Sequence, residues 1–171
     1  MRHWNGWGSD EIEMAVPPKA LDFLADHLGP PLATRTASFA EVVGCVPASR
    51  LPQHPGVSTD PALRLRHARG QSLPDWAALR FGAVDCFPDG VAFPTSEEEV
   101  AEIIGFGVRT GARLIPYGGG TSVVGHINPQ PGEAPVLTID MGCMARLEAL
   151  DTRSRLATFG AGVTGPHLEA Q

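Results

Sequence analysis

The stretch that decides the fold is Ile115-Pro116-Tyr117-Gly118-Gly119-Gly120-Thr121-Ser122-Val123, where a short apolar run meets three glycines. Residues 113–116, Arg-Leu-Ile-Pro, predict a strand that leads directly into the glycines. Three consecutive glycines allow a positive φ and let a ligand approach the backbone without interference from Cβ atoms. Successive N–H groups in such a turn form a concave nest for anions, and Thr121 and Ser122 add hydroxyl donors. A nucleotide pyrophosphate suits this set of donors, the alternatives being a tight turn that only ends the strand or a flexible linker.

The residues around this stretch alternate between strand and helix patterns. Residues 90–93 predict a strand, and Ser96-Glu97-Glu98-Glu99 opens a helix with capping-box spacing and an acidic first turn. An apolar stripe of helical period follows, formed by Val100, Ile103, Ile104, Gly107 and Val108. With the strand at 113–116, these segments predict a βαβ unit. Further strands are expected at 135–140, 147–150 and 155–159, and a helix from residue 164.

A second glycine motif, Gly160-Ala161-Gly162-Val163-Thr164-Gly165, has the spacing of a dinucleotide fingerprint. It comes after at least three other strands, whereas the fingerprint normally follows the first strand of its fold. We interpret it as a turn between a strand and a helix. The chain also contains no Gly-Lys-Ser/Thr, which excludes a Walker-type P-loop.

The first half of the chain has a different character. Short helices are predicted at 19–28, 38–43 and 60–67, while residues 47–60 hold three prolines and show no periodicity. We therefore predict an α+β fold in two parts: a helical, Pro-rich arm over residues 1–84 without a sheet of its own, and the βαβ unit with its further strands over 85–171.

Composition narrows the function classes. The 171 residues are 43% hydrophobic and 19% charged with a net charge of −6, which favours a globular protein and disfavours nucleic acid as a partner. No apolar run reaches the roughly 18 residues of a membrane span, and no secretory signal is visible, so we expect a cytoplasmic protein.

The three cysteines form no Cys-x-x-Cys pair and the six histidines no His-x-x-x-His pair. We expect reduced, mostly buried thiols and no metal site.

Four segments match one family in order and spacing. They are Pro94-Thr95-Ser96-Glu97-Glu98-Glu99-Val100, residues 115–123, Thr138-Ile139-Asp140-Met141 with Met144, and Ala161-Gly162-Val163-Thr164-Gly165 with Leu168-Glu169. Together they resemble the first lobe of the PCMH-type FAD-binding domain in the FAD-linked oxidases, the vanillyl-alcohol oxidase family. Within that family the N-terminal half resembles the alkylglycerone-phosphate synthases, through Arg2-x-Trp4-x-Gly6-Trp7-Gly8, Arg66-His67-Ala68-Arg69-Gly70, Asp75, Arg80 and Pro88-Asp89-Gly90-Val91.

The resemblance implies a flavoenzyme that holds FAD non-covalently, with residues 116–122 against the pyrophosphate. It implies exchange of the acyl chain of acyl-dihydroxyacetone phosphate for a fatty alcohol, without net redox change, on a small-molecule or lipid-like substrate. One alternative is an FAD-dependent 2-hydroxy-acid oxidase or dehydrogenase, and another is a non-catalytic fragment or one half of a split flavoenzyme. The family's catalytic residues are expected beyond residue 171, so none is assigned here, and a homodimer or a complementing chain is a possible partner.

Several other residues invite a functional role but favour a structural one. His126 departs from the glycine that relatives often have, and we interpret it as a residue on the loop surface, not as a site of covalent flavin attachment. Trp4 and Trp7 are expected to anchor the arm to the body. Arg66 and Arg69 are expected to be solvated or to form salt bridges.

Overall fold

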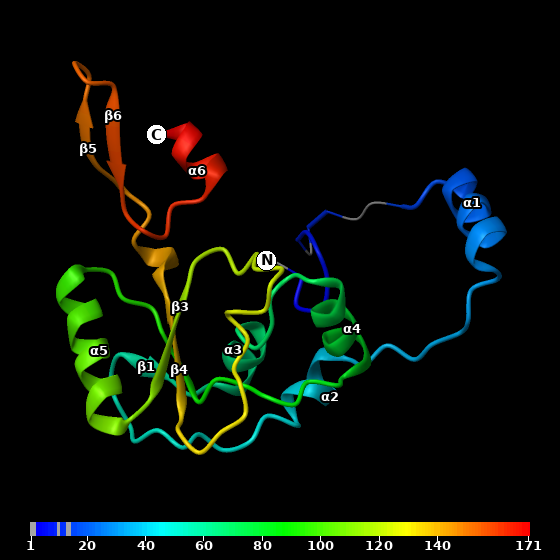
Figure 1. Ribbon diagram of the computed structural model, residues 1–171, viewed down its shortest axis with the longest axis horizontal. Helices are drawn as coiled ribbons and strands as arrows, with labels where there is room; N and C mark the ends of the chain where they lie inside the picture. Colours follow the sequence, from blue (N-terminus) through cyan, green and yellow to red (C-terminus); the bar gives the residue numbers. More distant parts are fainter. Residues whose placement is uncertain (1–2, 10, 13–14) are drawn as a thin grey trace.

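A four-stranded sheet forms the centre of the protein (Figure 1); the computed structural model describes residues 3–9, 11–12 and 15–171. The strands lie in the order β1-β2-β4-β3. Their bounds are Val57–Ser58 for β1, Gly90–Ala92 for β2, Arg113–Tyr117 for β3 and Val136–Asp140 for β4. Strands β2, β4 and β3 run parallel, and β1 pairs with β2 in the antiparallel direction. Four successive residues of β4, from Val136 to Ile139, are buried, as expected for a strand at the centre of a sheet.

The predicted βαβ unit is present, but its two strands are not neighbours. Helix α5 (Glu97–Thr110) connects β2 to β3, and β4 then inserts between them. The Ser96 side chain caps α5 as expected, whereas the Glu99 carboxylate accepts hydrogen bonds from the N–H and hydroxyl of Thr95 instead of completing a capping box. The helix buries Ile103 and Phe106 against the apolar residues of β2 and β4.

The arm is more ordered than its sequence predicts. Three predicted helices are confirmed as α1 (Pro18–Leu28), α2 (Phe39–Val43) and α3 (Pro61–Arg66), and a fourth, α4 (Leu73–Phe81), was not predicted. Helices α2, α3 and α4 share a core with the segment before β2, formed by Val42, Leu65, Ala68, Leu79 and Phe87. They lie on the opposite side of the sheet from α5 (Figure 1). The arm also contributes the short strand β1, which the sequence did not predict and which forms one edge of the central sheet; the arm's bounds, residues 1–84, stay a prediction.

Helix α1 is an exception within the arm. It stands apart from the sheet in Figure 1 and buries none of its residues, so its predicted apolar stripe faces solvent over Leu21, Leu24 and Leu28.

An ion pair joins the arm to the start of the sheet. The Asp89 carboxylate, which is 3% exposed, accepts hydrogen bonds from the backbone N–H, Nε and Nη2 of Arg50 and from the N–H of Val136. The Arg50 guanidinium also donates to the carbonyls of Gly132 and Glu133, in the connection that leads into β4. Burial alone would raise the pKa of Asp89, but the hydrogen bonds from Arg50 and Val136 outweigh it and hold that pKa below its ordinary value.

The chain leaves the sheet through a short 3₁₀ helix, η1 (Met141–Cys143), and then forms a hairpin of β5 (Leu147–Asp151) and β6 (Leu156–Phe159). This hairpin projects from the body in Figure 1 and exposes Leu150 and Leu156. Helix α6 (Gly165–Ala170) follows. The glycine motif at 160–165 is a strand-to-helix turn, as predicted, and a Cβ at Gly162 would collide with the carbonyl of Met141. Close backbone packing therefore accounts for a glycine here.

The cysteine prediction was partly wrong. All three thiols are free, but Cys45 and Cys143 are exposed and Cys86 is half-buried. Cys45 lies in the turn after α2, and Cys143 is the last residue of the short helix η1.

Candidate functional site

The glycine stretch begins where the parallel strands end. Tyr117, the last residue of β3, is paired in register with Asp140, the last residue of β4, and β2 ends at the same edge. Ligands of open parallel sheets bind beyond the carboxyl ends of the strands. The predicted site, residues 116–122, therefore lies at the edge of the sheet where such a ligand is expected.

The three glycines have different roles. Gly120 alone among them has a left-handed backbone, with φ of 67°, so the expectation of positive φ holds for one glycine and not for all three. Gly118 and Gly119 are exposed and lack a positive φ. No atom of the described residues lies within 4 Å of a Cβ built at Gly118, and at Gly119 there is only the Thr121 methyl, at 3.7 Å. The fold itself thus has no steric need for these two glycines, and the space beside them fits a ligand that approaches the backbone closely.

The other predicted residues differ in exposure. Pro116 and Thr121 are exposed, whereas Tyr117 is 4% exposed and its hydroxyl donates to the carbonyl of Arg66 at 3.4 Å. The Ser122 hydroxyl is buried and finds no hydrogen-bond partner among the described residues. An orphaned hydroxyl in a glycine loop is consistent with a site that an oxygen-rich ligand completes.

The arm packs against the back of this loop. The N–H of Gly70 donates to Oδ1 of Asn128 at 2.9 Å, and Nδ2 of Asn128 donates to Oδ1 of the buried Asp75 at 2.7 Å. The N–H of Gln71 donates to the carbonyl of Ser122 at 2.7 Å. The sequence indicated Gly70 and Asp75 only through the family resemblance, and it gave no signal for Asn128, because the partners lie more than 50 residues apart.

Replacement of Gly70 should loosen this packing. A Cβ at Gly70 would collide with the Ser122 carbonyl, so we expect Gly70→Ala to lower the free energy of unfolding by about 2 kcal/mol in urea titrations. The matched control is Gly118→Ala in the same loop, where a methyl meets open space and the change should stay within about 0.5 kcal/mol. Equal stabilities for the two variants would contradict this description of the contact.

A pocket of about 250 Å³ opens beside the loop, between the loop, the end of β4 and the arm. Gly118 and Gly119 line it together with His67 and Asp140. His67, which directly follows α3, is 6% exposed, and its imidazole packs 4.6 Å from the Tyr117 ring. Its Nε2 lies 2.9 Å from Oδ2 of Asp140. Sequence reasoning did not single out either residue as part of the site.

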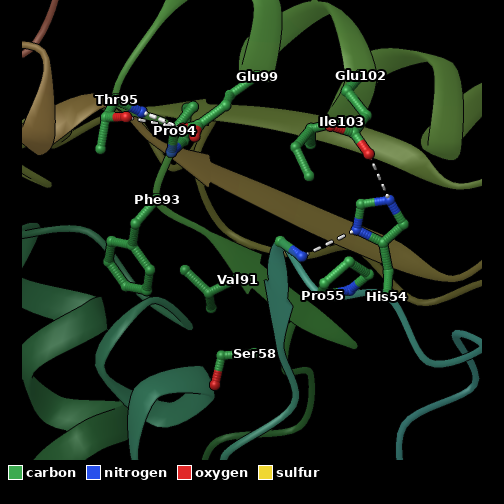
Figure 2. Close-up of a pocket in the computed structure, with 11 residues that line it drawn as sticks. His54, Pro55, Ser58, Val91, Phe93, Pro94, Thr95, Glu99, Glu102 and Ile103 are labelled. Atoms are coloured by element: carbon green, nitrogen blue, oxygen red, sulfur yellow. Dashed lines mark hydrogen bonds and ion pairs between the residues drawn. The ribbon is translucent and has the colours of Figure 1, made fainter.

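A larger cavity, of about 530 Å³, lies between α5 and β1. Figure 2 shows His54 facing Glu102, and Glu99 beside Thr95. Nδ1 of His54 accepts a hydrogen bond from the N–H of Gly56, and Nε2 of the same ring lies 3.5 Å from Oε1 of Glu102. The Glu99 carboxylate accepts a hydrogen bond from the N–H of Thr95. These polar side chains of the larger cavity already have hydrogen-bond or ion-pair partners within the protein. The smaller pocket at the glycine loop is therefore the better candidate site.

The remaining singled-out residues have structural roles or lie at the surface. His126 is exposed on the loop, as predicted. Trp4 packs edge-on against Phe39, and Arg69 pairs with Asp85. Trp7 approaches Trp76 but stays largely exposed, and Arg2 lies outside the described residues.

In the part of the chain that the structure describes, no group of three or more side chains could hold a metal ion. No helix among these residues has the length and apolar character needed to cross a bilayer.

Comparison with known proteins identifies relatives of this chain. Residues 88–171 match the FAD binding domain family. The alkyldihydroxyacetonephosphate synthase of Dictyostelium discoideum is 33% identical over 145 residues, which cover 85% of this chain and 23% of that protein. The mitochondrial D-lactate dehydrogenase (cytochrome) of Arabidopsis thaliana is 44% identical over 64 residues, covering 37% of this chain and 11% of that protein.

A solved structure of an alkyldihydroxyacetonephosphate synthase superposes with a TM-score of 0.81 and 26% identity, over 99% of this chain and 38% of that chain. The likeness therefore extends through the arm as well as the sheet, which confirms the predicted fold class. The chain spans about a fifth of the length of the curated synthases that it matches. Residues 88–171, just under half of the chain, are similar to the FAD binding domain family, and this similarity indicates FAD as the cofactor.

Proposed function

We propose that this protein binds FAD non-covalently, with residues 116–122 against the pyrophosphate. The observation that carries the proposal is the open space beside Gly118 and Gly119, because the fold gives no steric reason of its own for a glycine at either position. When bound, FAD supplies a ring system that can accept electrons or a substrate carbon. The role of this chain is to hold the pyrophosphate and to keep the strand ends and the arm in place around it.

The proposed reaction is that of an alkylglycerone-phosphate synthase: exchange of the acyl chain of acyl-dihydroxyacetone phosphate for a fatty alcohol. Two observations support it, the likeness to the Dictyostelium synthase and the superposition through the arm. Oxidation of a 2-hydroxy acid is the second candidate, favoured by the 44% identity over 64 residues to a D-lactate dehydrogenase. We propose a cytoplasmic location, and we assign no catalytic residue. The proposed partner is a second copy of the chain or a complementing chain.

One experiment separates these functions. The protein is purified from its native gene with any residues encoded after codon 171, and its flavin content is measured by absorbance. It is then incubated with acyl-dihydroxyacetone phosphate and a fatty alcohol, or with D-lactate and an artificial electron acceptor. Release of fatty acid without reduction of the acceptor supports the synthase. Reduction of the acceptor supports the alternative, and a stop codon after Gln171 with neither activity supports a non-catalytic fragment.

The 171 residues alone should bind FAD weakly. Gly118, Gly119 and Thr121 lie at an exposed edge, so a bound dinucleotide would leave most of its surface in water. We expect a Kd above about 1 μM, a binding free energy weaker than roughly −8 kcal/mol, in titrations that follow flavin fluorescence. Tight, saturable binding by a monomer would show that this part of the site is sufficient.

The same chain should also associate. Leu150 and Leu156 on the projecting hairpin and Leu28 on α1 expose apolar surface that monomers usually cover. We expect sedimentation velocity to show dimers or larger species that dissociate on dilution. A single monomeric species at about 100 μM would contradict this expectation.

A further inference from the structure

The His67 ring lies between two hydrogen-bond acceptors. Its Nδ1 is 2.7 Å from the carbonyl oxygen of Leu63, one turn earlier in α3, and its Nε2 is 2.9 Å from Oδ2 of Asp140. A carbonyl oxygen can only accept, so Nδ1 carries a hydrogen and donates it. The neutral ring has a single N–H, which leaves Nε2 with a lone pair directed at the Asp140 carboxylate.

A second proton therefore lies between Nε2 of His67 and Oδ2 of Asp140 and makes this contact a hydrogen bond. Without it, two lone pairs would face each other at hydrogen-bond distance in a site where both side chains are largely buried. The proton sits on His67, giving an imidazolium and a carboxylate, or on Asp140, giving a neutral ring and a neutral acid. In both cases the pair has no net charge. The other oxygen of Asp140 already accepts the N–H of Gly142, which fixes the orientation of the carboxyl group.

This pair lines the same pocket as Gly118 and Gly119. An unpaired Asp140 carboxylate would place a negative charge beside the position proposed for a diphosphate, and charges in a partly buried site repel strongly. The groups that face the pair come from every element around it: Arg66 from α3, Tyr117 from β3, Phe93 after β2, and His3 from the N-terminal segment. Asp140 is the one carboxylate among the described residues that line this pocket.

We infer that His67 is a positioning residue that neutralises Asp140 beside the glycine loop, so that the pocket accepts a phosphate-bearing ligand. This inference rests on the proposed function for the ligand, whereas the proton assignment rests on the hydrogen bonds alone. Because the partners come from the arm and from the end of β4, the arm contributes to the charge of the site as well as to its packing.

The proton assignment is tested first, without ligand. Histidine labelled with ¹⁵N in the ring and aspartate labelled with ¹³C at Cγ report the charge of each group by NMR at neutral pH. We expect either a doubly protonated His67 with an ionised Asp140, or a neutral ring with a protonated Asp140. In Asp140→Asn the ring should become neutral. A neutral His67 beside an ionised Asp140 in the native protein would overturn the inference.

Ligand binding is tested next by titrating the ¹⁵N-glycine-labelled chain with FAD and following the Gly118 and Gly119 amide resonances, which report weak binding as well. His67→Gln leaves Asp140 charged, and we expect the affinity to fall about tenfold. Asp140→Asn and the double variant His67→Gln/Asp140→Asn carry no net charge at the pair, so both should bind within about twofold of the native chain. Because the repulsion is electrostatic, the loss in His67→Gln should shrink as salt is raised.

The outcomes separate the two claims. Native affinity in His67→Gln, or a double variant as weak as His67→Gln, would overturn the inference and leave the proposed function standing. If His67→Gln fails to fold, the inference is decided by Asp140→Asn, since a large loss of affinity in that variant would mean that the carboxylate helps binding. If the native loop resonances do not move at millimolar FAD, the proposed function fails and the ligand role of His67 falls with it.

Discussion

Gly119→Val should abolish FAD retention while leaving the fold intact. The valine side chain would enter the open space beside the loop, where the proposal places the pyrophosphate, and its Cβ would have only the Thr121 methyl of the described residues within 4 Å. The backbone at Gly119 lacks a positive φ, so a β-branched residue does not force a left-handed conformation there. We expect the flavin-to-protein absorbance ratio of the purified flavoprotein to fall at least tenfold, with a thermal midpoint of the apoprotein within a few degrees of the native value.

The neighbouring glycine provides the matched control. Gly120 has φ of 67° and is buried, so Gly120→Val should lose FAD together with roughly 1–3 kcal/mol of stability. A Gly119→Val protein that keeps its full flavin content would refute the placement of the pyrophosphate at residues 116–122. A Gly119→Val protein that is as destabilised as Gly120→Val would show that glycine is needed there for the fold and not for the ligand.

The elements predicted best from the sequence are those whose own residues determine them. Helix α5 has a serine cap, an acidic first turn, an apolar stripe and a glycine at its end, and each of these signals acts within a few residues of the chain. The edge of the sheet that carries the glycine loop was also predictable, since a strand followed by three glycines is a local pattern. The family resemblance then added the identity of the ligand, which no local pattern gives.

The features that were not predicted depend on contacts between distant segments. Strand β1 has two residues and no alternation of its own, and it exists because Val57 and Ser58 pair with β2 more than 30 residues later. Helix α4 is the exception, because its signals are local: Ser72 and Asp75 form a capping box, a proline lies in its first turn and Gly82 ends it. His67 and Asp140 are 73 residues apart, so only the fold brings an ordinary histidine and an ordinary aspartate together beside the loop.

Asp89→Ala should cause the largest loss of stability among the substitutions considered. The variant removes a carboxylate that accepts four hydrogen bonds at the point where the arm, β2 and β4 meet. It leaves the N–H of Val136 without its acceptor in the interior, and it removes the carboxylate that offsets the charge of the buried Arg64 nearby. We expect the free energy of unfolding to fall by about 3 kcal/mol at pH 7 in urea titrations. The control is Asp85→Ala, which removes an exposed partner of Arg69 and should cost less than about 1 kcal/mol.

The pH dependence of this difference provides an independent check. The pKa of Asp89 is lowered in the folded protein, so the folded state binds the proton less readily than the unfolded chain does. Its contribution is therefore complete above the ordinary aspartate pKa of about 4 and is lost as the pH falls through the lowered value. The stabilities of the native protein and of Asp89→Ala should differ by a constant amount from pH 5 to 8 and approach each other below pH 4. A difference that stays constant down to pH 2 would mean that Asp89 stabilises the protein through packing alone and not through its charge.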